Sequence, residues 1–560
     1  MSSAPATSQQ QTGQADGGSP LIRPRLLTEL LDKAVAEHPK RPALDFMGRR
    51  WRYEEVGALV DRAARGLQDL GLKPGDRFGL CLPNTPYFVI LYFAVLRAGG
   101  IVVNFNPLYV ERELDHQIRD SGTRMMAVPD LKMIHEKVAA VADTTGLEKI
   151  IVCPMTDILP PVQSWGFRLF KRADHAVVPR DTRHVNFRKL VALDAAPRPV
   201  PQNPDDIAVL QYTGGTTGVP KGAMLSHANL AANSAQMLAH VGSLRPVQER
   251  TLGILPMFHV FALTTVLNYS IEIAAEIVLL PRFEMDQVLA TIKRTRPTQF
   301  FGVPTIYVAF NGLADDRLPD MTSIRTCISG GAPLPLEVRE LFEQRTHVRV
   351  VEGYGLSEAS PIIACNPLFE GEVKENSCGP QFPGTILEIR DPAAPEHVLP
   401  QGERGEVCVR GPQVMHGYWQ RPEDSAAVFV DGALRTGDIG YLDEDGYLFL
   451  VDRIKDVILC GGYNVYPRMI EDAAYHHPAV KEAIAIGIPD KYRGQSPKLF
   501  VALHDGQSVS PDELRAFLGE RLSKIEIPRE IEMRAALPRT LIGKLSKKEL
   551  IEEEALNRQG

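Results

Sequence analysis

The sequence predicts an α/β protein. We expect a large N-terminal domain with α/β layered subdomains and a small β-barrel-like subdomain, followed by a small α+β C-terminal domain. Through the first two-thirds of the chain, short apolar runs alternate with helical stretches, which is typical of parallel sheets with crossover helices. After about residue 380 the predicted strands follow one another closely, with turn residues between them. Towards the C-terminal end, helical and strand patterns mix again.

The first α/β unit lies between Arg77 and Val103. An apolar strand ends at Leu82, a helix spans 84–97 and a second strand spans 101–103. A strand, a helix and a strand within about thirty residues indicate a right-handed parallel crossover. The most membrane-like run, 87–96, has roughly half the length that a bilayer span needs. It therefore predicts a buried helix.

Further short apolar runs predict the remaining strands. In the α/β part they are "RMMAVPD" (from 124), "KIIVCP" (149), "AVLQYT" (208), "EIVLLP" (276), "TQFFGVP" (298), "IRTCISGG" (324) and "RVVEGYG" (349). In the antiparallel part they are "TILEIRD", "GEVCVRG" and "GYLFLVDR". In the C-terminal domain we expect a helix over 467–476, the strands "EAIAIGI" and "KLFVAL", and a helix that begins at Pro511.

These changes of pattern predict the domain boundaries. Residues 1–20 have neither a basic start nor an apolar core, and we expect a disordered tail there. Residues 21–451 would form the N-terminal domain and residues 452–552 the C-terminal domain. We expect a hinge between them, near Asp452.

Composition narrows the class of function. The 560 residues are 44% hydrophobic and 23% charged, with a net charge of -7, which gives no bulk attraction to nucleic acid. The seven cysteines are odd in number and contain no C-x-x-C pair, which argues against a disulfide framework and against a zinc site. We therefore expect a cytoplasmic protein without a nucleic-acid partner.

The segment "QYTGGTTGVPKG" (211–222) places a loop rich in glycine and threonine directly after an apolar strand. In open α/β sheets, ligands bind beyond the carboxyl ends of the strands. Backbone amides and threonine hydroxyls there can donate hydrogen bonds to phosphate, and Lys221 adds positive charge. The loop is not a Walker loop, because Lys221 follows a proline. From composition alone, a mobile surface loop is an equal alternative.

This loop resembles the signature of the acyl-adenylate-forming enzymes, which include acyl-CoA synthetases, peptide-synthetase adenylation domains and luciferases. Six later segments resemble the remaining motifs in family order: "LPMFHVFA" (255–262), "SGGAPLP" (329–335), "EGYGLSEAS" (352–360), "RTGD" (435–438), "DRIKDVILCGGYNVYP" (452–467) and "PRTLIGK" (538–544). The resemblance covers most of residues 25–550. It implies that ATP converts a carboxylic acid to an acyl-adenylate with release of pyrophosphate, and that a thiol then displaces AMP.

The resemblance also implies a role for each motif residue. The phosphate loop would consist of Thr213, Gly214, Gly215, Thr216, Thr217, Gly218 and Lys221. Gly330, Gly331 and Ala332 would form the backbone wall of the purine pocket. The next motif would supply Glu352, Gly353, Tyr354, Gly355 and Ser357. Tyr354 would stack on adenine, and Ser357 would contact a phosphate.

Three charged residues complete the predicted nucleotide site. Glu358 and Thr213 would hold Mg²⁺, which prefers a few protein oxygens beside phosphate; a solvated glutamate at a helix start is the alternative. Asp438 would accept hydrogen bonds from the ribose hydroxyls, and Arg453 would reach the same sugar or the α-phosphate. The alternatives are a turn aspartate and a surface arginine.

For the C-terminal domain the resemblance implies two orientations. In the first, Lys544 would bridge the carboxylate and the α-phosphate during adenylation, although composition alone favours solvated charge. In the second, after a turn about Asp452, Lys455 and the pair Gly461 and Gly462 would flank the channel for the pantetheine of coenzyme A.

Other segments bear on the acid and on the membrane. His259, within "MFHVF", would gate the acyl or thiol channel, and the alternative is a packed core histidine. Phe261, Leu263 and Val266 would suit an aliphatic chain and equally a core. Residues 160–172 combine an apolar stripe at helical spacing with three basic residues. Our hypothesis is peripheral contact with the inner membrane face, and the alternative is a helix docked on the protein.

The longer motifs, such as "EGYGLSEASPIIACNP" and "VRGPQVMHGYWQRPE", most resemble bacterial long-chain fatty acid–CoA ligases. We predict an acid–thiol ligase that uses ATP, Mg²⁺ and coenzyme A to activate medium- to long-chain fatty acids, dicarboxylic acids included. The alternatives are a fatty acyl-AMP ligase that loads a carrier protein, an aryl or other acid–CoA ligase, and a catalytically silent nucleotide-binding partner. Whether the chain forms a homodimer stays open.

Overall fold

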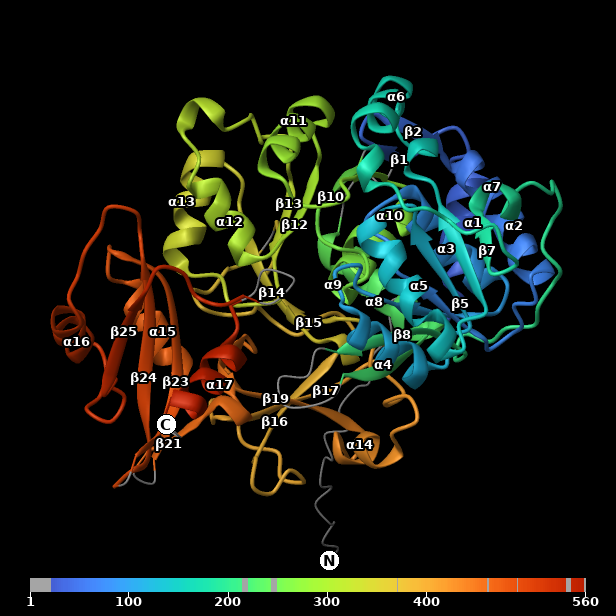
Figure 1. Ribbon diagram of the computed structural model, residues 1–560. Helices are drawn as coiled ribbons and strands as arrows, with labels where there is room; N and C mark the ends of the chain where they lie inside the picture. Colours follow the sequence, from blue (N-terminus) through green and yellow to red (C-terminus); the bar gives the residue numbers. More distant parts are fainter. Residues whose placement is uncertain are drawn as a thin grey trace, which may run out of the picture.

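The computed structural model describes residues 22–213, 220–242, 249–369, 371–460, 463–490, 492–539 and 545–557. The expected tail, residues 1–20, lies outside this part. Figure 1 shows two large sheets with their helices in the N-terminal part, and a smaller sheet with β16, β17 and β19 below them in the view. The C-terminal part, in orange and red, lies at the left beside α12 and α13.

The first large sheet carries the predicted unit between Arg77 and Val103. All of its neighbouring strand pairs are parallel except the hairpin β8–β9. In spatial order its strands are β7 (His184–Asn186), β6 (Lys149–Cys153), β5 (Met125–Pro129), β3 (Arg77–Leu80), β4 (Ile101–Asn104), β8 (Ile207–Thr213) and β9 (Lys221–Ser226). The helices of this region are α2 (Tyr53–Asp69), α3 (Pro86–Arg97), α4 (Glu111–Ser121), α5 (Lys132–Thr145), α6 (Pro161–Phe170), α7 (Phe187–Leu190) and α8 (His227–Val241).

Helix α3 is the apolar run that resembles half a membrane span. It begins at Pro86, whose fixed φ suits a first helical turn, and every residue from Pro86 to Leu96 is buried. It packs against α2 and against the strands β3 and β4 that it connects. The prediction of a buried crossover helix is therefore confirmed. In the part of the chain that the structure describes, no helix has the length and apolarity to cross a bilayer.

The second large sheet is parallel in its centre and antiparallel at both ends, where β1 pairs with β2 and β14 with β15. In spatial order its strands are β15 (Ile362–Cys365), β14 (Val351–Gly355), β13 (Thr326–Ser329), β12 (Gln299–Gly302), β10 (Arg250–Gly253), β11 (Glu276–Leu279), β1 (Pro42–Phe46) and β2 (Arg49–Arg52). Its helices are α1 (Thr28–Glu37), α9 (Val260–Ala262), α10 (Tyr269–Glu272), α11 (Met285–Thr295), α12 (Pro304–Asn311) and α13 (Leu336–Thr346). A buried π-helical segment, Leu263–Asn268, joins α9 to α10.

The third sheet is antiparallel, as the closely spaced strand pattern predicts. Its strands are β16 (Ile386–Arg390), β17 (Gly405–Arg410), β19 (Ala433–Leu442), β18 (Phe429–Val430) and β20 (Leu448–Arg453), with α14 (Pro422–Ala427) beside them. Side chains from this sheet and from both large sheets pack in one continuous apolar core. The N-terminal part is therefore packed as a unit.

The C-terminal part has a sheet and two small cores of its own, one of which is built around Ile458 and Leu499 and the other around Phe500 and Leu550. Its strands are β22 (Tyr463–Val465), β21 (Ile458–Cys460), β24 (Gly494–Leu503), β23 (Val480–Asp490) and β25 (Glu530–Arg534). Its helices are α15 (Pro467–Tyr475), α16 (Pro511–Gly519) and α17 (Lys547–Asn557). The α+β pattern expected for this region is confirmed.

Candidate active site

The hairpin β8–β9 holds the two ends of the glycine-rich segment. Thr213, the last residue of β8, is the register partner of Lys221, the first residue of β9. The Thr213 hydroxyl donates a long hydrogen bond of 3.5 Å to the carbonyl of Lys221. Residues 214–219 lie outside the described residues, so the phosphate-binding roles of Gly214, Gly215, Thr216, Thr217 and Gly218 stay predictions.

Lys221 points from the hairpin towards α14. Its Nζ lies 2.8 Å from Oδ1 of Asp424 and 5.4 Å from the centre of the Tyr418 ring. A carboxylate and an aromatic face both stabilise an ammonium group. The predicted phosphate lysine is thus held beside the glycine-rich segment by partners that the sequence did not indicate.

Glu358 lies in a 3-10 turn, Ser357–Ala359, that follows β14 and packs against β8 and β9. Glu358 is half-buried, and desolvation raises the pKa of its carboxyl group. The hydroxyl of Tyr418 donates a 2.8 Å hydrogen bond to Oε1 of Glu358. Among the ion pairs of the described residues, none includes Glu358.

A half-buried carboxylate that forms no ion pair among the described residues fits a hard divalent ion. Mg²⁺ takes one or two protein oxygens and completes its shell with water and phosphate oxygens. The hydroxyl of Thr213 at the end of β8 and the carboxylate of Glu358 are oxygen donors of this kind. The residues present therefore fit the predicted Mg²⁺ site.

Tyr354, Asp438 and Arg453 come together from three strands. The Tyr354 hydroxyl donates a hydrogen bond to Oδ2 of Asp438, and Nε of Arg453 lies 3.2 Å from Oδ1 of the same carboxylate. Asp438 and Arg453 are register partners in β19 and β20. Asp438 is a buried strand residue, so the alternative of a turn aspartate is wrong. The Arg453 side chain, in contrast, is 53% exposed.

The predicted purine wall follows β13. Gly330 is buried, and a Cβ atom there would lie 3.1 Å from the ring of Phe261. Glu352 in β14 accepts hydrogen bonds from the backbone nitrogen of Leu334 at 2.8 Å and from the thiol of Cys378 at 3.5 Å. Burial raises the pKa of Glu352. In this structure the Glu352 carboxylate holds the segment that contains the wall.

Four other motif residues extend this wall. Gly331 has a positive φ of 81°, and Ala332 beside it is half-buried. Gly353 packs opposite Cys365, and a Cβ at Gly355 would lie 2.2 Å from the carbonyl oxygen of Pro361. Gly355 therefore has no room for a larger side chain, and this glycine brings two backbone segments close together.

His259 precedes α9 and is half-buried, with its ring 5.6 Å from the ring of Phe258. The segment before it is anchored by Asn84, whose Nδ2 donates to the carbonyl of Leu255 at 2.7 Å. Asn84 Oδ1 accepts from the nitrogen of Met257 at 2.8 Å. His259 is thus not enclosed in the core, and its gating role stays a prediction.

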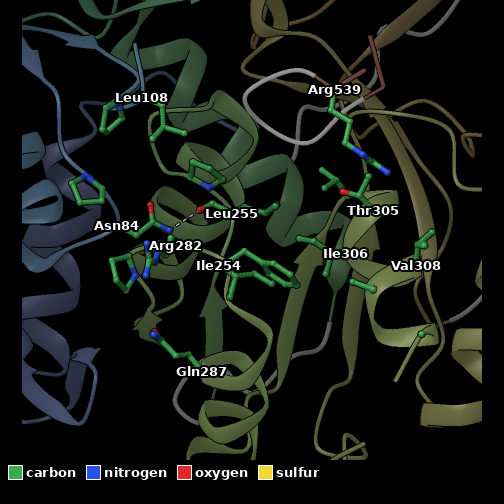
Figure 2. Close-up of a pocket in the computed structure, with 18 of the residues that line it drawn as sticks. Asn84, Leu108, Ile254, Leu255, Arg282, Gln287, Thr305, Ile306, Val308 and Arg539 are labelled. Carbon is green, nitrogen blue, oxygen red and sulfur yellow. Dashed lines mark hydrogen bonds between the residues drawn. The ribbon is translucent and has the colours of Figure 1, made fainter. Parts of the chain in front are cut away.

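A cavity of about 2100 Å³ lies among the first sheet region, the second sheet region and the C-terminal part. Its walls come from residues 254–258, from α6, α12 and α13, and from residues 475–482 with Arg539. Figure 2 shows Asn84 bonded to Leu255 on one side and Arg539 directed towards Thr305 on the other. Phe258 and Pro335 line it, whereas Thr213, Glu358 and Asp438 do not, so the cavity adjoins the nucleotide residues without containing them.

Two of the residues that we considered for an aliphatic chain lie elsewhere. Leu263 and Val266 belong to the π-helical segment and are fully buried in the main core. Neither lines the cavity. The core alternative is therefore the one that describes them, and the apolar walls of the cavity come from other residues.

Helix α6 forms part of the cavity wall, and it confirms the helix expected within 160–172. Phe167 and Phe170 line the cavity, and Phe167 also contacts the ring of His175 at 4.8 Å. The apolar stripe faces outward, with Val162 83%, Trp165 67% and Leu169 56% exposed. The helix is thus docked through Phe167 and leaves an apolar face uncovered.

Beyond Arg453, Lys455 is the one remaining predicted site residue of the C-terminal part that lies among the described residues. It lies in the turn Ile454–Asp456, where desolvation and the nearby charge of Arg453 lower the pKa of Lys455. Gly461 and Gly462 lie outside the described residues, and so does Lys544, within 540–544. Their roles stay predictions.

Three residues that the sequence did not single out hold the site together. Tyr418 donates a hydrogen bond to Glu358, Asn84 accepts one from the segment 254–257, and Asp424 forms an ion pair with Lys221. The aromatic pair Tyr418–Trp419 in "HGYWQ" was a visible signal, because a tyrosine in a glycine-containing loop often donates a hydrogen bond. Asn84 and Asp424 carry no comparable local signal.

Comparison with known families gives the class of this protein. A family model described as AMP-binding enzyme matches residues 31–419, and a model described as AMP-binding enzyme C-terminal domain matches residues 469–544. The chain therefore belongs to the AMP-binding enzyme family.

Individual relatives and solved structures are also similar to this chain over most of its length. A long-chain-fatty-acid–CoA ligase of Bacillus subtilis (strain 168) is 40% identical over 542 residues, which covers 95% of each chain. A feruloyl-CoA synthase of Amycolatopsis sp. is 34% identical over 513 residues, which covers 91% of this chain and 96% of the relative. Among solved structures, the anthranilate CoA ligase AuaEII in complex with anthranoyl-AMP matches with a TM-score of 0.85 and 26% identity, covering 97% of this chain and 99% of that one.

Proposed function

We propose that this protein is an ATP-dependent acyl-CoA ligase for medium- to long-chain fatty acids, dicarboxylic acids included. The observation that carries the proposal is the full-length similarity to a long-chain-fatty-acid–CoA ligase. Two further observations support it: the cluster of Tyr354, Asp438 and Arg453, and a large cavity that many apolar side chains line. A nucleotide and an acyl chain would then meet near His259.

The first half-reaction joins the acid to AMP. An oxygen of the fatty acid carboxylate attacks the α-phosphorus of ATP, the bond to the β-phosphate oxygen breaks, and pyrophosphate leaves with that electron pair. Lys221 and Lys544 would offset the negative charges that meet in this step. Thr213 and Glu358 would hold Mg²⁺, which supplies further charge neutralisation on the phosphates.

The second half-reaction transfers the acyl group. The sulfur of coenzyme A attacks the acyl carbonyl carbon, the thiol proton goes to solvent or a base, and AMP leaves with the electrons of the broken C–O bond. Asp438 and Tyr354 would keep the ribose in place during both steps. For the second step, the C-terminal domain (452–552) would turn about Asp452 and bring Lys455, Gly461 and Gly462 to the site.

The separate packing of the C-terminal part supports such a turn. Its own small cores let it move as a rigid body, while a few residues near Asp452 absorb the change of backbone angle. Asp452 accepts hydrogen bonds from its own neighbour Arg453 and from the nitrogen of Arg468, so it lies where the two parts join.

Two alternatives differ in the acceptor and in the acid. A fatty acyl-AMP ligase would pass the acyl group to a carrier protein, and an aryl-CoA ligase would take an aromatic acid. The similarity to a feruloyl-CoA synthase favours the aryl alternative. That relative is 34% identical to this chain, however, whereas the long-chain-fatty-acid–CoA ligase is 40% identical. Many of the side chains that line the cavity are apolar, among them Leu108, Ile254 and Phe258, which suits an aliphatic chain.

One assay separates these functions. AMP release is measured with acids from octanoate to stearate, with their dicarboxylic counterparts and with ferulate, each with and without coenzyme A. We expect rapid AMP release for the aliphatic acids only when coenzyme A is present. Acyl-AMP formation that coenzyme A does not discharge would indicate the carrier-protein alternative. An exclusive response to ferulate would indicate the aryl alternative, and no response to any acid would refute the proposal.

We also propose that the protein is cytoplasmic and contacts the inner membrane face through α6. The exposed apolar stripe of Val162, Trp165 and Leu169 supports this contact, because water disfavours such a patch. Phe170 is 78% exposed and also lines the cavity. A fatty acid dissolved in the bilayer would therefore lie close to the cavity entrance.

Vesicle flotation tests this contact. The variant with Trp165→Ala, Leu169→Ala and Phe170→Ala should lose most of its binding to vesicles that contain phosphatidylglycerol. The matched control changes two exposed apolar residues elsewhere, Ile386→Ala and Leu556→Ala, and should float like the wild type. Equal flotation of the triple variant and the wild type would contradict the membrane proposal.

A further inference from the structure

Residues 411–421, here called the tyrosine loop, connect β17 to α14 and lie against the strand that follows the glycine-rich segment. The loop is bonded to β9 by three backbone hydrogen bonds: Trp419 N to Gly222 O at 2.8 Å, Met224 N to Gly417 O at 2.9 Å and His416 N to Met224 O at 3.0 Å. A fourth, from Met415 N to the carbonyl of Glu358 at 2.8 Å, joins it to the turn after β14. The loop thus ties two separate segments of the nucleotide site together.

The side chain of Tyr418 makes the contact that concerns the chemistry. It is buried, with 9% of its surface exposed, and its hydroxyl donates to Oε1 of Glu358 at 2.8 Å. On its other side, the ring faces the ammonium group of Lys221. One side chain therefore contacts both the carboxylate and the lysine that the nucleotide phosphates would meet.

We propose that Tyr418 is a positioning residue for the ATP-dependent half-reaction, acting through Glu358. This inference rests on the proposed function. The hydroxyl donates to one oxygen of the Glu358 carboxylate and restricts the rotation of this group. The carboxylate therefore stays oriented towards the metal ion. A neutral donor suits this task, because a cationic partner would compete with the metal for the carboxylate charge.

A role in packing alone would make a different prediction. Tyr418 belongs to the main apolar core, so its ring contributes to stability whether or not its hydroxyl matters. Removing only the hydroxyl separates the two roles. Tyr418→Phe keeps the ring and deletes the hydrogen bond to Glu358.

The matched control is Tyr447→Phe. The hydroxyl of Tyr447 also donates one hydrogen bond, to the carbonyl of Glu372 at 2.7 Å, but it lies in an exposed turn of the third sheet. The two variants lose the same atom and the same number of hydrogen bonds. A melting curve for each variant shows whether the fold is kept.

The first readout is metal binding without turnover. Mn²⁺ binding to the protein with a non-hydrolysable ATP analogue is measured by electron paramagnetic resonance. We expect Tyr418→Phe to bind Mn²⁺ about tenfold more weakly, the lower end of the effect seen when a hydrogen-bond partner of a metal ligand is removed. Tyr447→Phe should bind like the wild type.

The second readout divides the reaction. The Mg²⁺ concentration for half-maximal pyrophosphate exchange should rise by a similar factor in Tyr418→Phe, while acyl transfer from preformed acyl-AMP to coenzyme A stays unchanged. Unchanged Mn²⁺ affinity would overturn the inference, and so would an equal loss in both half-reactions with a lowered melting temperature. If the wild type exchanged no pyrophosphate with any acid, the proposed function would fail, whereas the Mn²⁺ measurement would still decide the role of Tyr418.

Discussion

The nucleotide site and the C-terminal part are held in place in opposite ways. The site residues come from segments that are far apart in the sequence and bond directly to one another, as in Tyr354 to Asp438 and Tyr418 to Glu358. The C-terminal part packs around its own cores, and an exposed ion pair of 2.8 Å between His476 and Glu337 joins it to α13. Exposed pairs of this kind contribute at most about 1 kcal/mol. The residues of one region are fixed by direct bonds to one another, whereas the other region has cores of its own and could move as a rigid body.

The largest expected effect is the loss of adenylation when Lys544 is replaced, which tests whether the C-terminal part moves. If Lys544 is delivered by a moving domain for adenylation alone, Lys544→Ala should lower pyrophosphate exchange by at least about 100-fold, the effect of losing a group that stabilises developing charge. Acyl transfer from preformed acyl-AMP to coenzyme A should largely survive. Stopped-flow or quench measurements of each half-reaction would check this.

The control for this variant is Lys548→Ala, in the exposed first turn of α17, where Lys548 makes only a long contact of 3.9 Å to Glu552 among the described ion pairs. Both half-reactions should stay near wild type in the control. An equal fall of both half-reactions in Lys544→Ala would mean that the domain does not take two orientations.

A smaller effect on both half-reactions is expected from a change in the nucleotide site. Tyr354→Phe removes the hydrogen bond to Asp438, and the ribose is present in both ATP and acyl-AMP. Both half-reactions should therefore fall together, by about threefold to tenfold, the usual net value of one hydrogen bond. The values of kcat/KM for ATP and for acyl-AMP provide the measurement.

Tyr441→Phe is the control, because Tyr441 lies three positions after Asp438 on β19 and stacks on Phe449 through its ring. It should leave both values unchanged. A loss confined to one half-reaction in Tyr354→Phe would show that the ribose is not held by the same residues throughout.

The sequence allowed the order of the elements to be predicted where the signal is local. The unit from Arg77 to Val103 and the buried α3 follow from apolar runs whose length and spacing depend on neighbouring residues only. Long-range pairs could not be predicted in this way. Tyr418 lies 60 positions after Glu358, and Asp438 lies 84 positions after Tyr354, so their contacts depend on how the sheets pack.

In two places local signals left alternatives open, and the structure decides between them. A turn aspartate was the alternative for Asp438 in "RTGD", but the residue belongs to β19, where its register with β20 sets its partner Arg453. Leu263 and Val266 looked equally suited to a ligand and to a core, and the π-helical segment turns them into the core. Apolar character does not by itself distinguish a residue that lines a cavity from a residue in the hydrophobic core.

The cavity has walls from the N-terminal part and from the C-terminal part, since Ile306 of α12 and Val338 of α13 line it together with His476 and Arg539. Its volume is therefore not a fixed property of the fold, and it must change whenever the C-terminal part reorients. A bound chain long enough to touch both walls would resist that reorientation, whereas a short chain would not. Chain length would then influence the timing of the catalytic cycle as well as the affinity for the acid.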